Sequence, residues 1–276
     1  MGVNMKVVYY VPDVGNPFWG EVVSGMNGRA KAEGITLEVV SANDGARQLA
    51  QLEDYQRRNP DGVFISPVDM NGISLLCRSI LKSGVPIMAI DQSLKPNVTG
   101  SVISGNMKGG MLAAAYLADS LPAGSRVVQI RAEQDLQNVM LRSTSFEQEV
   151  TRRGLKIVER IQADSQRNLA FEKTTRVLRE NKPFDAIFAE NDNMALGAVK
   201  ALKEARYFPR PLVVGYDGIP EALEAIRSDS MDATIAQNPV ALGQTALDIF
   251  LLAIKQRPFE AVTTVMPRLI TKLDAG

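Results

Sequence analysis

Short apolar runs alternate with segments of helical period along most of the chain. The runs, which we expect to be strands, lie at 6–11, 36–41, 62–66, 86–90 and 101–104, and again at 126–131, 156–161, 185–189, 212–215 and 231–236. The amphipathic segments, which we expect to be helices, lie at about 18–32, 45–58, 71–82, 106–119, 139–152, 168–180, 192–204, 219–227 and 239–255. Nearly continuous apolar strands are typical of parallel sheets with helices on both faces. The pattern predicts an α/β protein with doubly wound parallel sheets.

The second series of elements repeats the first. In each series, a strand with a Phe three residues after an Asp (61–64 and 185–188) leads into a helix. A later apolar strand then stops at an aspartate, Asp91 or Asp217. These shared features occur in the same order, which predicts two similarly built lobes. The apolar helix 239–255 could return to the first lobe, and the chain would then cross between the lobes more than once.

Chain length and charge limit the number of domains and the kind of partner that this sequence can have. The chain has 276 residues, 45% hydrophobic and 22% charged, which suits two compact domains because single cores stop growing at about 250–300 residues. There are 31 Lys and Arg against 31 Asp and Glu. A nucleic-acid partner usually requires a basic excess, so we expect a neutral small-molecule partner and no nucleic acid.

The chain has no His and one Cys. Zinc clusters and Ser-His-Asp or Cys-His catalysis are therefore excluded, and we expect no catalytic residue, no metal site and no cofactor. Cys77 lies among apolar positions of helical spacing, which predicts a buried helix residue. No run of about 18 apolar residues occurs, so no membrane span is predicted.

Polar and aromatic side chains gather where the expected strands end. In open parallel sheets, ligands bind beyond the carboxyl ends of the strands. The segments that follow those ends are 16–19, 66–69, 91–92, 190–192, 216–217 and 237–238, with Arg142 after the loop that follows 126–131. Their carboxylates and amides can accept hydrogen bonds from hydroxyl groups, while Arg and amide NH₂ groups donate to them. Aromatic faces cover the C–H face of a ring, so the mixture favours a small polyhydroxylated ligand.

Several of these positions also have a purely structural interpretation. Asn16 before Pro17 suits a helix N-cap, and Asp192 could equally cap the helix that follows it. Phe18 and Trp19 at a strand-to-helix turn are more often core residues than ligand contacts. Asp91 and Asp217 could be turn-forming aspartates, and Arg142 could be a solvated surface arginine.

Several ordered motifs resemble those of ribose-type periplasmic sugar-binding proteins of ABC transporters. They are NPFW at 16–19, IDQ at 90–92, ND-x-MALGA at 191–198, VGYDG at 214–218, TIAQNP at 234–239 and the closing LITK at 269–272. The resemblance covers nearly the whole chain and implies the type I periplasmic binding fold, which lactose-repressor-type effector domains share. It implies two lobes, 1–104 plus 238–267 and 105–237 plus 268–276, joined by a three-segment hinge. The ligand would lie between the lobes and be trapped by hinge closure.

The same resemblance implies which side chains contact the ligand. They are Asn16, Phe18, Trp19, Ser66, Asp91 and Gln92 in the first lobe, and Arg142, Asn191, Asp217 and Gln237 in the second. Asp91 and Arg142 would make charge-assisted hydrogen bonds to ring hydroxyls. Ribose binders typically carry Arg at Gln92, Asn at Ser66 and an aromatic residue at Ser165. A site matched to hydroxyl groups discriminates strongly, so these departures predict a ligand other than ribose.

The predicted function is a periplasmic solute-binding protein that captures a monosaccharide or sugar alcohol and delivers it to the membrane permease of an ABC transporter. We expect a monomer, with a signal peptide removed from the mature chain. One alternative is the effector-binding domain of a lactose-repressor-type transcription regulator lacking its DNA-binding headpiece. A third class is an enzyme in which Asp91 and Asp217 imitate the carboxylate pair of a glycosidase.

Overall fold

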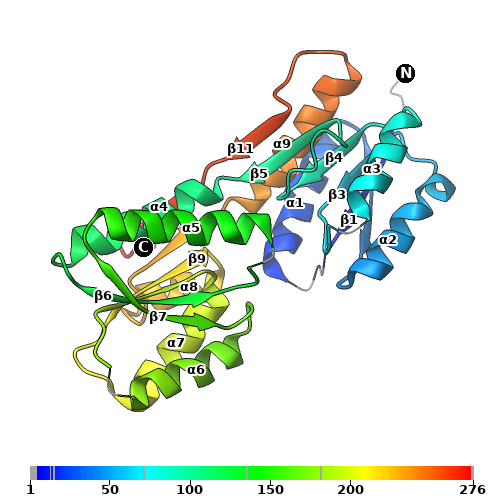
Figure 1. Cartoon of the computed structure of the whole chain (residues 1–276). Coiled ribbons are helices and arrows are strands. Elements are labelled where there is room, and N and C mark those ends of the chain that lie inside the picture. Colours follow the sequence, from blue (N-terminus) through cyan, green and yellow to red (C-terminus); the bar gives the residue numbers. More distant parts are fainter. Residues whose placement is uncertain are drawn as a thin grey trace. The chain divides into compact units, whose positions relative to one another are not determined.

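The computed structural model describes residues 5–12, 14, 16–70, 72–134, 136–180 and 182–274. The chain forms two compact units, which are described separately (Figure 1). Unit 1 comprises Met1–Ser104 and Asn238–Val265, and unit 2 comprises Gly105–Gln237 and Met266–Gly276.

Unit 1 is built on a six-stranded sheet in the order β11-β5-β4-β3-β1-β2, in which all neighbours are parallel. Its strands are β1 (Lys6–Val11), β2 (Thr36–Ser41), β3 (Gly62–Ile65), β4 (Ile87–Ile90), β5 (Gly100–Ser104) and β11 (Val262–Val265). Its helices are α1 (Pro17–Ala32), α2 (Gly45–Glu53), α3 (Ile73–Lys82) and α9 (Pro239–Ile254), with a 3₁₀ turn η1 (Tyr55–Arg58).

Successive residues of the unit 1 strands enter two different core layers. Tyr9 and Phe64 pack with α1 and α9 on one face, whereas Tyr10 and Ile65 pack with α2 and α3 on the other. This alternation follows from the two-residue period of a strand. Cys77 is a buried member of the α3 layer, as its helical spacing predicts.

Helices α1 and α9 approach each other through glycines. A Cβ on Gly25 would lie 2.1 Å from the Val240 carbonyl oxygen, and one on Gly243 would lie 2.1 Å from the Val22 carbonyl oxygen. The backbone leaves no room for a side chain at either position. The first and last helices of unit 1 therefore pack at backbone distance.

Unit 2 has a sheet in the order β12-β10-β9-β8-β6-β7. Its strands are β6 (Arg126–Arg131), β7 (Lys156–Gln162), β8 (Ala186–Ala189), β9 (Leu212–Asp217), β10 (Ala233–Ala236) and β12 (Arg268–Thr271). Its helices are α4 (Asn106–Ser120), α5 (Gln137–Arg152), α6 (Arg167–Arg179), α7 (Asp192–Ala205) and α8 (Pro220–Arg227). Helices α4 and α5 share one core layer with the sheet, and α6, α7 and α8 share the other.

The predicted fold class is confirmed, because each unit is a mostly parallel sheet with helices on both faces. All ten expected strands are present, but β11 and β12 were not predicted, and β12 is antiparallel to β10. The expected helix 45–58 is wrong as a single element, since α2 ends at Glu53 and a separate 3₁₀ turn follows. The expected start of the third helix at 71 lies outside the described residues. Among those that are described, no helix has both the length and the apolar character needed to cross a bilayer.

Candidate functional site

The unit 1 candidates follow three neighbouring strands. Asn16 comes before α1, which follows β1; Ser66 follows β3; and Asp91 and Gln92 follow β4. Strands β1, β3 and β4 are adjacent and parallel, so these residues lie at the same end of the sheet. This is the edge at which open α/β sheets bind ligands.

The segment 16–19 opens α1. The Asn16 side-chain oxygen accepts a hydrogen bond from the Phe18 N–H at 3.0 Å, with Pro17 at the first helical position, so its N-cap role is confirmed. The Phe18 and Trp19 rings lie nearly perpendicular, with centroids 4.9 Å apart, and both pack against the unit 1 core. Both side chains remain half-buried. Each ring therefore joins the core while keeping some exposed surface.

Ser66 belongs to a buried hydrogen-bonded group whose other members, Tyr9 and Gln48, were not predicted. Its hydroxyl lies 2.8 Å from the Tyr9 hydroxyl, and both residues are buried. Its carbonyl accepts from the Gln48 amide at 2.9 Å, and the Gln48 oxygen accepts from the Val68 N–H at 2.9 Å. Burial raises the pKa of the Tyr9 phenol well above its ordinary value, and the charge of Asp91 adds to this effect. Tyr9 therefore stays neutral beside Ser66.

Asp91 and Gln92 are both buried at the end of β4. The Asp91 N–H donates to the Val102 carbonyl at 2.8 Å, which ties the start of the turn to β5. Its φ is +68°, in the left-handed region that residues other than glycine rarely adopt. Such a conformation persists only where the surroundings fix it, as they do here.

Arg142 is a buried residue of α5, so the interpretation as a solvated surface arginine is wrong. Its Nη2 donates to the Asn106 side-chain oxygen at 2.9 Å, and its Nη1 donates to the Glu190 carbonyl. The guanidinium carbon lies 3.4 Å from the centroid of the Tyr216 ring, a cation–π arrangement. The guanidinium is thus oriented by neutral oxygens and an aromatic face.

Asp217 is the last residue of β9, and Gln237 directly follows the adjacent strand β10. The Gln237 amide donates to Asp217 Oδ1 at 2.7 Å, and the Gln237 N–H donates to the Asp217 carbonyl at 3.1 Å. Loss of hydration raises the pKa of Asp217 to about 6, while the nearby Arg142 charge and the Gln237 bond oppose the rise. The arrangement places a carboxylate, an amide and a guanidinium close together in unit 2.

Asn191 and Asp192 have different structural roles. Asn191 caps α7, with its side-chain oxygen accepting from the Met194 N–H at 2.8 Å. Asp192 is fully buried and accepts from Gly218 N–H, Ile219 N–H and the Thr234 hydroxyl instead. The interpretation of Asp192 as the helix cap is therefore wrong.

Glu190 was noted at a strand end but its partners were not predicted. Its buried carboxylate accepts from Gln129 at 2.9 Å, from the Ala132 N–H at 2.9 Å and from Gln134 at 3.0 Å. Burial raises its pKa. Because its carbonyl also accepts from Arg142, this network links the β6 end to the candidate arginine.

Ser165, which stands where ribose binders carry an aromatic residue, follows β7 in a turn with φ +57°. Its hydroxyl donates to Glu133 Oε2 at 2.6 Å. At the position of that aromatic residue, unit 2 therefore has a small polar side chain that is hydrogen-bonded to a carboxylate.

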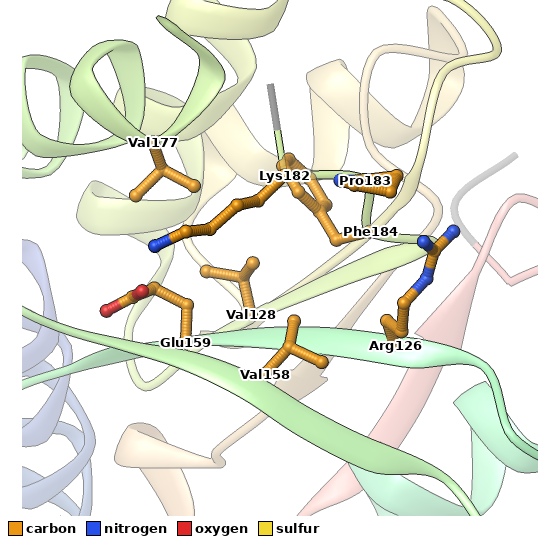
Figure 2. A pocket seen from close by; sticks show the side chains of 8 residues that line it. All are labelled: Arg126, Val128, Val158, Glu159, Val177, Lys182, Pro183 and Phe184. Atoms are coloured by element: carbon orange, nitrogen blue, oxygen red, sulfur yellow. The ribbon is translucent and has the colours of Figure 1, made fainter. Parts of the chain in front are cut away.

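A hollow of about 210 Å³ lies elsewhere in unit 2, beside β6, β7 and α6 (Figure 2). It adjoins a bulge at which Val158 is the extra residue opposite Val127 and Val128. Its lining is mostly apolar and consists of Arg126, Val128, Val158, Glu159, Val177, Lys182, Pro183 and Phe184. None of the ten predicted ligand residues is among them. The described residues form no group of three or more His, Cys, Asp or Glu that could hold a metal.

Known proteins resemble this chain over most of its length. A family model described as a periplasmic binding protein domain matches residues 7–258. The ribose import binding protein RbsB of Bacillus subtilis is 32% identical over 240 residues, which are 86% of this chain and 78% of that protein. An ABC transporter solute-binding protein of Actinobacillus succinogenes with bound D-allose has a TM-score of 0.92 at 26% identity, covering 99% of both chains. The Caulobacter myo-inositol binding protein has a TM-score of 0.89 at 28% identity, covering 100% of this chain and 96% of its own.

Proposed function

This chain belongs to the periplasmic binding protein family, and we propose that it captures a monosaccharide or sugar alcohol and delivers it to the permease of an ABC transporter. The relatives above are named for ribose, D-allose and myo-inositol. Those compounds are small rings that carry several hydroxyl groups. We propose the periplasm as the site of capture, a monomeric state and no nucleic-acid partner.

The cluster of Arg142, Asp217 and Gln237 is the observation that carries this proposal. It combines a buried guanidinium, a carboxylate and an amide within unit 2. A sugar hydroxyl both donates and accepts, so such a mixture can satisfy adjacent hydroxyls of one ring. We propose that Arg142 donates to the ligand and that Asp217 accepts from it, with Asn191 and Gln237 as further polar contacts.

Unit 1 would supply a complementary set. We propose that Asp91 and Gln92 bind hydroxyls, that Ser66 and Asn16 add polar contacts, and that the half-buried rings of Phe18 and Trp19 cover a C–H face. The Asp91 N–H donates to the Val102 carbonyl of β5, which fixes where the Asp91 side chain starts.

The proposed activity is binding without chemical change. The relatives are named as binding proteins, and in that role Asp91 and Asp217 accept hydrogen bonds rather than attack or protonate a glycosidic bond. Their names also favour transport over the regulator alternative.

A thermal-shift screen followed by calorimetry tests the proposal. The panel contains D-ribose, D-allose, myo-inositol, other hexoses and linear sugar alcohols. A compound that binds only the folded protein stabilises it by about 2.7 kcal/mol at a hundredfold excess over its Kd. We expect a clear shift with one or two related compounds and a smaller shift with D-ribose. No shift with any compound, in protein freed of co-purified ligand by unfolding and refolding, would overturn the proposal.

A further inference from the structure

Asp192 is a buried acidic residue whose side-chain hydrogen bonds all reach beyond its own helix. Its Oδ2 accepts from the Gly218 N–H at 2.7 Å and from the Ile219 N–H at 2.9 Å, and its Oδ1 accepts from the Thr234 hydroxyl at 2.7 Å. Because Asn191 already caps α7, the Asp192 carboxyl group is not needed for that purpose. Its donors show that it serves the turn after β9.

The hydrogen bonds of this carboxyl group span three neighbouring strands. Asp192 follows β8, its two amide donors follow β9, and Thr234 lies in β10. Gly215, which pairs with Thr234, makes the reach possible. A Cβ on Gly215 would lie 2.1 Å from Asp192 Oδ1, so the sheet keeps this space open for the Asp192 carboxyl group.

The anchored turn directly follows Asp217. Asp217 has a φ of +116° and Gly218 a φ of +80°, so two successive residues have positive φ. For an aspartate this conformation is strained and persists only if its surroundings hold it. Asp192 holds the backbone just after Asp217, while Gln237 holds the Asp217 carboxylate itself.

We propose that Asp192 is a positioning residue that aims Asp217 at a ligand hydroxyl, an inference that rests on the proposed function. Asp192 itself is fully buried beneath the turn, so its effect on binding would pass through Asp217. The geometry also accounts for the adjacent Asn-Asp pair: the first residue caps the helix and the second fixes the binding turn.

The test compares Asp192→Ala with Asp192→Asn by calorimetry, using the polyol that gives the largest thermal shift. Alanine leaves the two turn amides and Thr234 without their partner, so binding should weaken about tenfold or more. Asparagine keeps an oxygen for the amides and an NH₂ group for the Thr234 oxygen, so its affinity should stay within about threefold of the wild type. Val177→Ala, in α6, is the matched control: it should lower thermal stability but leave affinity unchanged.

Wild-type affinity in folded Asp192→Ala would overturn the inference. If Asp192→Ala does not fold, Thr234→Val takes its place, with about threefold weaker binding expected and unchanged affinity contradicting the inference. Amide hydrogen exchange provides a readout without ligand. The Gly218 and Ile219 amides should exchange faster in the alanine or valine variant than in the wild type and in Asp192→Asn. A wild-type protein that binds no polyol would overturn the proposed function, while unchanged exchange at both amides would separately overturn the anchoring role.

Discussion

The charge of the Asp217 carboxyl group should change in the mildly acidic range. Its pKa of about 6 reflects lost hydration, opposed by Arg142 and by the Gln237 bond. If Asp217 accepts a ligand hydrogen bond as a carboxylate, affinity should fall roughly tenfold between about pH 7 and pH 5. Calorimetry across this range checks the expectation. Asp217→Asn should bind more weakly but without the acid-side loss; equal wild-type affinity at pH 5 and pH 8 would contradict the prediction.

Asp192 should make folding stability depend on pH in the opposite direction from a paired surface carboxylate. Burial, with a smaller contribution from Asp217, raises its pKa from 3.8 to about 8. Between about pH 4 and 8 the folded chain keeps this proton and the unfolded chain has lost it. This contribution is therefore complete below about pH 4 and is lost as pH rises through about 8.

Urea unfolding at several pH values checks this second expectation. The wild type should lose stability between about pH 5 and pH 8 relative to Asp192→Asn, whose amide does not titrate. Parallel pH profiles for the two proteins would contradict it.

The sequence located the candidate side chains better than it located their partners. Strand ends can be read from apolar runs, so Asp91, Asp217 and Gln237 could be proposed. The Arg142–Asn106 bond joins residues 36 positions apart, and no local pattern marks it. The bonds of Asp192 depend on the order of β8, β9 and β10, which a one-dimensional pattern does not contain. The ligand roles of the ten candidates stay predictions.

At the scale of elements, the contact between α1 and α9 depends on having no side chain at Gly243. An added Cβ would meet the Val22 backbone, which cannot rotate away as a side chain could. Gly243→Ala should therefore lower the free energy of unfolding by about 1–3 kcal/mol.

Gly28→Ala is the matched control for this contact. Gly28 also lies in α1, but a Cβ there would meet nothing within 4 Å. Alanine should therefore raise stability by about 0.5–1 kcal/mol, through its better helix propensity. Chemical denaturation of both variants measures their free energies of unfolding. Equal changes at the two sites would contradict the prediction that the close contact between α1 and α9 excludes a side chain at Gly243.

Strands could be predicted from the sequence where every residue of the strand is buried. Strand β3 is buried at every position, and its run of apolar residues is unambiguous. Strands β11 and β12 have four residues each and are only partly buried, so Thr and Arg interrupt any apolar signal. Helix α2 stops where Asp54 takes the C-cap position, although the apolar spacing continues to Tyr55.

At the scale of the whole molecule, the chain passes between the units at 104–105, 237–238 and 265–266. Several short connections suit a hinge that a ligand can close. We expect small-angle scattering to show a smaller radius of gyration when the identified polyol is added. Asp91→Asn, which should lose ligand binding, should show no change. An unchanged radius in a wild-type sample shown by calorimetry to be saturated would contradict hinge closure.

Because α1 packs against α9, unit 1 cannot be completed until nearly the whole chain has been synthesised. Gly25 is synthesised early and Gly243 late. The apolar face of α1 therefore has no α9 to pack against while α4 to α8 are being synthesised. Unit 2 is encoded almost without interruption and lacks only β12 when α9 begins. A chain stalled or cleaved before residue 238 would thus contain a nearly complete second domain attached to a first domain with an uncovered core. That intermediate exposes apolar surface of the kind that drives aggregation and recruits chaperones.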